Sequence, residues 1–105
     1  MHFIQIGSRK YPRVTVHWKD IIGDSAMVDM EDSSQLLCPE IVTEGYLFDS
    51  FQEDGETYIR TFATWSDTQE GVSFGDRNCF PYTVLTRNSK HDVQNGLIFI
   101  RDNND

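Results

Sequence analysis

Residues 40–65 read EIVTEGYLFDSFQEDGETYIRTFATW. Two runs rich in β-branched and aromatic residues, Glu40–Phe51 and Thr57–Trp65, flank Asp54-Gly55, a dipeptide typical of a tight turn between antiparallel strands. The stretch therefore predicts a central β-hairpin. Gly45 interrupts the first run, and a missing side chain inside a strand favours a bulge or a sharp bend. We expect a curved sheet.

Arg13–Trp18 is the clearest strand outside this hairpin. Val14, Val16 and Trp18 occupy alternate positions, so their side chains share one face, and Pro12 marks the start of the strand. The other expected elements are short. In chain order they are a packed loop over Lys19–Ser25, an edge strand over Ala26–Met30, one helical turn over Asp32–Leu37 that Pro39 stops, a loop over Ser66–Gly71, a turn over Gly75–Asn78, a strand over Thr83–Arg87, and a last strand over Leu97–Ile100 that pairs with Phe3–Ile6.

The chain has 105 residues, of which 38% are hydrophobic, and this favours a single domain over residues 1–105 with one core. Residues 102–105 are expected to fray. No stretch approaches the roughly 20 apolar residues of a membrane span, and Met1–Gly7 has neither the basic lead nor the apolar run of a signal peptide. We therefore expect a cytoplasmic protein without membrane contact, in which Cys38 and Cys79 are reduced, buried thiols.

The formal net charge of −8 is unevenly distributed along the chain. From Asp20 to Glu56 there are eleven acidic residues and no Lys or Arg. A one-sided negative field of this kind repels phosphates and attracts basic protein surfaces. The distribution disfavours direct binding of nucleic acid and favours a basic protein partner.

The segment Phe80-Pro81-Tyr82-Thr83-Val84-Leu85, together with several short strands and a central hairpin, resembles an SH3-like β-barrel. SH3 domains place a Phe-Pro step and one 3₁₀ turn before their final strand, where proline suits a tight corner. The resemblance implies an all-β fold, a small antiparallel barrel with short helical turns. The residues at both ends, Met1–Pro12 and Asn88–Asp105, are expected to form an extra terminal strand pair. The motifs with which SH3 domains grip proline-rich peptides are absent, so that activity is not implied.

Four short motifs are similar to those of small uncharacterised proteins of tailed bacteriophages. They are Val14-Thr15-Val16-His17-Trp18-Lys19-Asp20, Gly45-Tyr46-Leu47, Tyr58-Ile59-Arg60 and Phe80-Pro81. The likeness covers residues 13–87, which we expect to form the barrel core. It implies an accessory gene of a phage or prophage and carries no activity with it.

Catalytic and metal-binding patterns are missing from the sequence. His2, His17 and His91 are far apart, and none has a cysteine or carboxylate at metal-ligand spacing. A nucleophilic Cys79 would need a helix N-terminus or an oxyanion loop, for which the sequence has no pattern. The glycines are scattered as turn glycines are, without a phosphate-binding loop. We expect a protein that is not an enzyme and that needs neither metal nor cofactor.

Aromatic residues occupy both faces of the predicted hairpin, so whichever row faces the core, the other leaves aromatic side chains outside. Two interpretations stay open: a second layer, from the terminal strands or a dimer partner, covers this face, or the face binds another protein inside an acidic rim. The residues predicted to bind a protein are Asp24, Asp29, Glu31, Asp32, Glu44, Tyr46, Phe48, Tyr58 and Phe62.

Three functions of different classes follow from these patterns. The first is a phage accessory protein that binds a basic host protein, such as a defence nuclease, a CRISPR effector or the transcription machinery, and inhibits or redirects it. The second is a sponge for a small signalling nucleotide at the interface of a homo-oligomer, and its predicted ligand-binding residues are Arg60, Trp65, Arg77, Tyr82 and Arg87. The third is a structural or assembly component of the virion.

Overall fold

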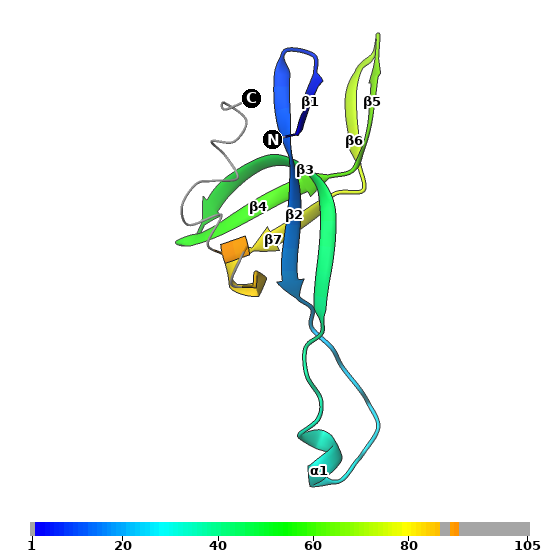
Figure 1. Cartoon of the computed structure of the whole chain (residues 1–105), viewed down its shortest axis with the longest axis vertical. Helices are drawn as coiled ribbons and strands as arrows, with labels where there is room; N and C mark the ends of the chain where they lie inside the picture. The colour runs from blue at the N-terminus through cyan, green and yellow to red at the C-terminus, as the bar shows by residue number, and fades with distance from the viewer. Residues whose placement is uncertain (1, 87–88, 91–105) are drawn as a thin grey trace.

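The computed structural model describes residues 2–86 and 89–90, and these form an all-β fold, as predicted. Five strands make one antiparallel sheet in the order β1-β2-β3-β4-β7, and β5 and β6 make a separate hairpin (Figure 1). The elements are β1 (Phe3–Ile6), β2 (Arg9–Lys19), α1 (Met30–Ser33), β3 (Glu40–Glu53), β4 (Glu56–Phe62), β5 (Thr64–Thr68), β6 (Gly71–Gly75), β7 (Asn78–Pro81) and the 3₁₀ helix η1 (Tyr82–Val84).

The predicted central hairpin is confirmed as β3 and β4. Asp54 and Gly55 have φ angles of 53° and 80°, the left-handed conformation that a two-residue hairpin turn with this dipeptide requires. The second strand ends earlier than predicted, at Phe62, and Trp65 belongs to β5. The chain leaves the sheet at this point to form the β5–β6 hairpin.

The predicted bulge is present, but not at Gly45. The register of β3 against β4 shifts between Leu47 and Asp49, which leaves Phe48 as the extra residue. At Gly45 a Cβ atom would lie 2.6 Å from the backbone carbonyl oxygen of Phe62. The glycine is therefore required by a close approach of two backbones, and the bend of β3 comes three residues later.

Strand β2 is longer than predicted. It begins at Arg9, so Pro12 lies inside it and not at its start. The Arg13 amide donates to the His2 carbonyl at 2.7 Å, on the side of β2 that faces β1. Successive backbone nitrogens of a strand point to opposite sides, so the nitrogen of Pro12 faces the β3 side. Pairing with β3 begins only at Arg13. The proline costs no ladder hydrogen bond there. The shared face of Val14, Val16 and Trp18 is confirmed, because the two valines are buried and the tryptophan packs against them.

The expected closed barrel does not form within residues 2–86 and 89–90. The 3₁₀ turn predicted after Phe80-Pro81 is present as η1, but it occupies part of the range Thr83–Arg87 where we expected a strand. What remains of that strand is a single bridge between Leu85 and Trp18, supported by the Thr86 amide donating to the His17 carbonyl at 2.8 Å. The curved sheet is thus joined across its opening by Leu85 and Thr86, and the buried Ser89 hydroxyl adds an acceptor for the His17 amide at 2.9 Å.

Two hydrophobic clusters lie in the fold. The first contains Val14, Val16, Leu47, Ile59, Phe80 and Leu85, on one face of the sheet. The second is aromatic: Ile6, Tyr11 and Phe62 are buried, with Ile4, Tyr46, Phe48 and Phe74 packed around them. The second cluster draws on β1, β2 and β6, so the aromatic face has a second layer supplied by the chain itself. The core consequently extends upstream of residue 13, where the predicted barrel core began.

Several short predictions are wrong in their details. The range Ala26–Met30 forms no strand, and the helical turn begins at Met30, two residues before the predicted range Asp32–Leu37. The predicted loop over Ser66–Gly71 is a strand as far as Thr68. Cys38 and Cys79 are free, but both are exposed.

Phe3–Ile6 pairs with the start of β2. Its predicted partner Leu97–Ile100, the C-terminal half of the terminal strand pair and the frayed tail 102–105 lie outside the described residues.

Candidate functional site

Residues 20–39, which we call the arm, connect β2 to β3 and extend away from the sheet (Figure 1). The base of the arm is closed by the Asp20 amide, which donates to the Pro39 carbonyl at 3.0 Å, next to the last β2–β3 pair. Every residue from Ile21 to Pro39 is exposed. The predicted packed loop over Lys19–Ser25 is therefore wrong, because its apolar residues do not reach the core.

The arm holds seven of the large hydrophobic side chains that the structure exposes. Met27 is fully exposed, and the exposed fractions of Met30, Ile21 and Leu37 are 88%, 86% and 75%. The seven residues are Ile21, Ile22, Met27, Val28, Met30, Leu36 and Leu37. Single exposed hydrophobic residues are ordinary, but a concentration of them on one protruding segment is typical of an interaction site.

Aspartate side chains shape the backbone of the arm through local hydrogen bonds. The Asp24 carboxylate accepts from the Ala26 amide at 2.9 Å, and the Asp29 carboxylate accepts from the Asp32 amide at 2.9 Å as the N-cap of α1. Glu31, in the first turn of α1, has the charge sign that a helix start favours. Because α1 has a single turn and no buried residue, these bonds set the local shape while the apolar side chains point into solvent.

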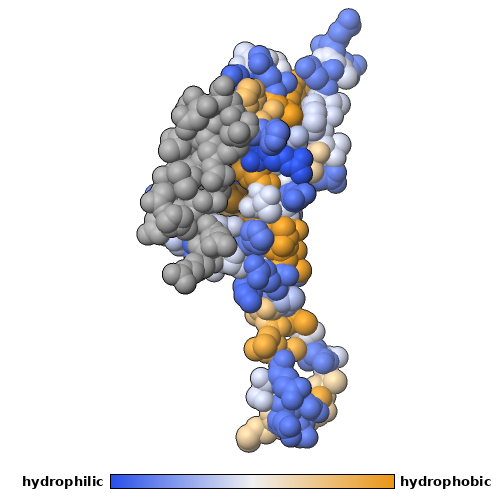
Figure 2. All heavy atoms as spheres, viewed as in Figure 1, coloured by the Kyte–Doolittle hydropathy of each residue, from blue (hydrophilic) through white to orange (hydrophobic). Residues whose placement is uncertain are grey.

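The arm is acidic as well as apolar. It contains five carboxylates and no Lys, Arg or His. Figure 2 shows hydrophobic and hydrophilic residues side by side along its length. The combination offers apolar contact area within a negative field, which suits a partner surface of positive charge.

The structure separates the acidic and aromatic residues that we predicted to bind a protein together. Asp24, Asp29, Glu31 and Asp32 lie on the arm. Glu44 lies on β3, where Arg13 donates to its carboxylate at 3.1 Å. The predicted acidic and aromatic surface is therefore divided between the arm and the sheet.

The aromatic residues that we predicted to bind a protein mostly pack against other side chains of the fold. Phe62 is only 1% exposed, so it is a core residue and not a surface anchor. Tyr46 and Phe48 are half-buried around it. Tyr58 stacks on Phe51, with the ring centroids 5.1 Å apart and the planes 8° from parallel. Of the two interpretations left open, a second layer covers Tyr46, Phe48 and Phe62. Part of that layer is Phe74 of the β5–β6 hairpin, which the sequence analysis did not predict.

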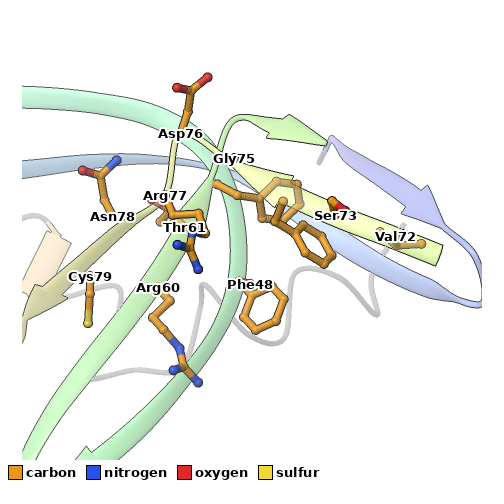
Figure 3. A pocket seen from close by; sticks show the side chains of 12 residues that line it. Phe48, Arg60, Thr61, Val72, Ser73, Gly75, Asp76, Arg77, Asn78 and Cys79 are labelled. Carbon is orange, nitrogen blue, oxygen red and sulfur yellow. The ribbon is translucent and has the colours of Figure 1, made fainter. Parts of the chain in front are cut away.

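A pocket lies between the sheet and the β5–β6 hairpin, with a cavity volume of about 750 Å³ (Figure 3). It brings together two of the predicted ligand-binding residues, Arg60 and Arg77. Trp65 packs against Tyr46, and Tyr82 packs on the first cluster, so neither lines the pocket. Arg87 lies outside the described residues. The rings in the pocket are Phe48, Phe62 and Phe74 instead.

Arg60 is held in place by Asp49. Its Nε donates to one carboxylate oxygen at 2.6 Å and its Nη2 donates to the other, and its guanidinium lies 4.5 Å from the centroid of the Phe51 ring. The hydrogen bond to Asp49 raises the pKa of Arg60, against a smaller opposing effect of desolvation. Arg60 is thus a fixed cation at the wall of the pocket.

Neither a membrane-spanning helix nor a cluster of metal ligands occurs in the part of the chain that the structure describes. No helix there is long and apolar enough to cross a membrane. No group of three or more His, Cys, Asp or Glu side chains is arranged to hold a metal ion among residues 2–86 and 89–90. No protein family, curated protein or solved structure matches the chain.

The exposed apolar residues of the arm are what sequence reasoning missed. The segment has no helical or alternating pattern, and its aspartates stand at turn-forming positions between apolar pairs such as Ile21-Ile22 and Leu36-Leu37. An apolar segment without periodicity and with turn residues throughout has no regular face to bury. That signal was available in the sequence.

Proposed function

We propose that the chain is a protein-binding module and that its arm docks on a partner protein with a basic surface. The exposure of seven apolar side chains on a segment where every residue from 21 to 39 is exposed carries this proposal. Each large apolar side chain that a partner buries contributes about 1.5–3 kcal/mol of favourable transfer free energy, before the costs of association. The four most exposed of these side chains are Met27, Met30, Ile21 and Leu37. We take Met27, Met30 and Leu37 as the anchors that a partner would bury.

The charge of the arm favours a basic partner over an acidic or neutral one. Five carboxylates without a cation steer a positively charged surface toward the arm and repel acidic proteins and nucleic acid. Such a complex should form faster and more tightly at low ionic strength, because exposed charges are screened by salt.

The expected partner is a bacterial host protein, and the chain is then an accessory protein of a phage or prophage. The motifs that resemble phage proteins support this origin, and nucleic-acid-binding surfaces have the positive charge that the arm requires. A defence nuclease, a CRISPR effector or a component of the transcription machinery would be inhibited or redirected when the arm covers such a surface.

Affinity capture from a bacterial lysate, followed by titration of the purified partner, tests the proposal. The arm variant replaces Met27, Met30 and Leu37 by serine, and it should fold normally because all three side chains are exposed. The matched control replaces the exposed Val42 of β3 and Val72 of β6 by serine. Unfolding midpoints of both variants should be compared first with that of the unchanged chain.

The arm variant should lose at least about tenfold in affinity, because buried apolar anchors dominate binding energy, and the control should stay within about twofold. A further variant, Glu31→Gln with Asp32→Asn, should reduce the salt dependence of association. Equal binding by the arm variant and the control, or binding that does not weaken as salt rises, would contradict the proposal.

A further inference from the structure

The pocket beside the β5–β6 hairpin contains polar and aromatic groups that docking of the arm does not use. Its cavity volume of about 750 Å³ is within the range of small-molecule sites, and its walls come from β3, β4, β6, β7 and the link between the last two strands. We propose that this pocket binds a nucleoside monophosphate, with the phosphate at the arginines and the base against the phenyl rings.

The phosphate end would be bound by Arg77 and Arg60. Among the described residues no ion pair or hydrogen bond joins Arg77 to a carboxylate, and its side chain is exposed at the pocket wall (Figure 3). Arg60 uses two of its five N–H donors on Asp49, which leaves three for a ligand. Guanidinium groups match the geometry of phosphate oxygens better than ammonium groups do.

Local charge at this pocket is opposite to that of the whole chain. The charged residues that line it are two cations, Arg60 and Arg77, and one carboxylate, Asp76. Arg9 does not line the pocket, but its guanidinium lies 5.5 Å from the centroid of the Phe48 ring at the pocket wall. The Asp76 carboxylate accepts from the Thr64 hydroxyl and points away from the two arginines that line the pocket in Figure 3. A small anion finds favourable charge here.

The base end would lie against Phe48 and Phe74. Their ring centroids are 5.1 Å apart, and both rings are half-buried against Phe62, which fixes their positions. Aromatic side chains provide stacking surface for any base, whereas the exposed Ser73 and Asn78 provide donors and acceptors for its edge or for the ribose. This arrangement favours a nucleotide over inorganic phosphate alone.

The ligand should be a single nucleotide and not a nucleic acid. A polymer brings many phosphates toward a chain of net charge −8, whereas a monophosphate brings only the group that the arginines neutralise. The pocket also lies on the sheet and the β5–β6 hairpin, away from the arm, so nucleotide binding and docking of the arm are separable (Figure 1).

Titration of the full chain with AMP, followed by backbone amide NMR signals, tests the inference. AMP should shift the signals of residues 72–79 with a dissociation constant below about 1 mM. Adenosine and inorganic phosphate, each alone, should bind at least about tenfold more weakly, because each makes only half of the contacts. GMP, CMP and UMP in parallel titrations show whether the base is distinguished.

Three variants sharpen the result. Arg77→Ala should weaken AMP binding by about tenfold or more, the loss expected for a charged hydrogen bond to phosphate. Arg13→Ala, which removes an exposed arginine outside the pocket, and the arm variant should each stay within about twofold of the unchanged chain. Absence of shifts with all four monophosphates at about 10 mM, equal affinity for adenosine and AMP, or unchanged binding by Arg77→Ala would overturn the inference.

Discussion

Replacing Phe62 by leucine should lower the free energy of unfolding by about 2 kcal/mol. Phe62 is 1% exposed, and its ring contacts five other aromatic rings at centroid distances between 4.8 and 6.4 Å. Aromatic pairs contribute about 0.5–1.5 kcal/mol each beyond their buried area, and leucine keeps most of the apolar burial. The expected loss is smaller than the sum over five pairs because the neighbours repack around the smaller side chain.

Urea unfolding followed by tryptophan fluorescence measures this loss. With a denaturant dependence of about 1–2 kcal/mol per molar, the midpoint of Phe62→Leu should fall by roughly 1–2 M without a change of slope. The control Val72→Ala, at an exposed position of β6, should change the free energy of unfolding by less than about 0.5 kcal/mol. If Phe62→Leu behaves like this control, the second cluster is not a core and the aromatic face is free to bind a partner.

Two further perturbations test other parts of the fold. Gly45→Ala should destabilise the chain by about 1–3 kcal/mol, because its Cβ would lie 2.6 Å from the Phe62 carbonyl oxygen, whereas Gly23→Ala meets nothing within 4 Å and should unfold at the same urea concentration as the unchanged chain. Burial and then the charge of Glu56 raise the pKa of Tyr58 above 10.0, so the folded state favours the neutral phenol. The stability that the neutral phenol contributes to folding is complete below the ordinary pKa of tyrosine and is lost as pH rises through the raised pKa. The unfolding midpoint should therefore fall less steeply above pH 10 in Tyr58→Phe than in the unchanged chain, and parallel curves would refute this.

The strands that local patterns mark clearly could be predicted from the sequence. Asp54-Gly55 specifies its turn because few other residues accept two consecutive left-handed conformations, and Val14 and Val16 reveal their buried face by alternation. The position of Pro12 inside β2 could not be predicted, because proline cannot donate a ladder hydrogen bond and normally argues against a strand interior. It is tolerated here because no strand among the described residues pairs with it on the side that its nitrogen faces. That information is tertiary and not local.

The candidate site was predictable only in part, for the same reason. The acidic residues Asp24 and Asp29 were placed in an interaction surface, but their aromatic counterparts were not separable from a core by alternation alone. Phe62 is buried because β5 and β6 fold back over it, and no pattern within β4 contains that contact. Arg60 and Arg77 are 17 residues apart in the sequence, and the β5–β6 hairpin between them brings both to one pocket.

Site-specific photo-crosslinking with a captured partner tests the role of the arm most directly. A photoreactive residue in place of Met27, which is fully exposed near the middle of the arm, should form a covalent adduct with the partner, and the same residue in place of Val72 on β6 should not. Adducts from position 72 without adducts from position 27 would contradict the proposal, because the partner would then contact the hairpin and not the arm.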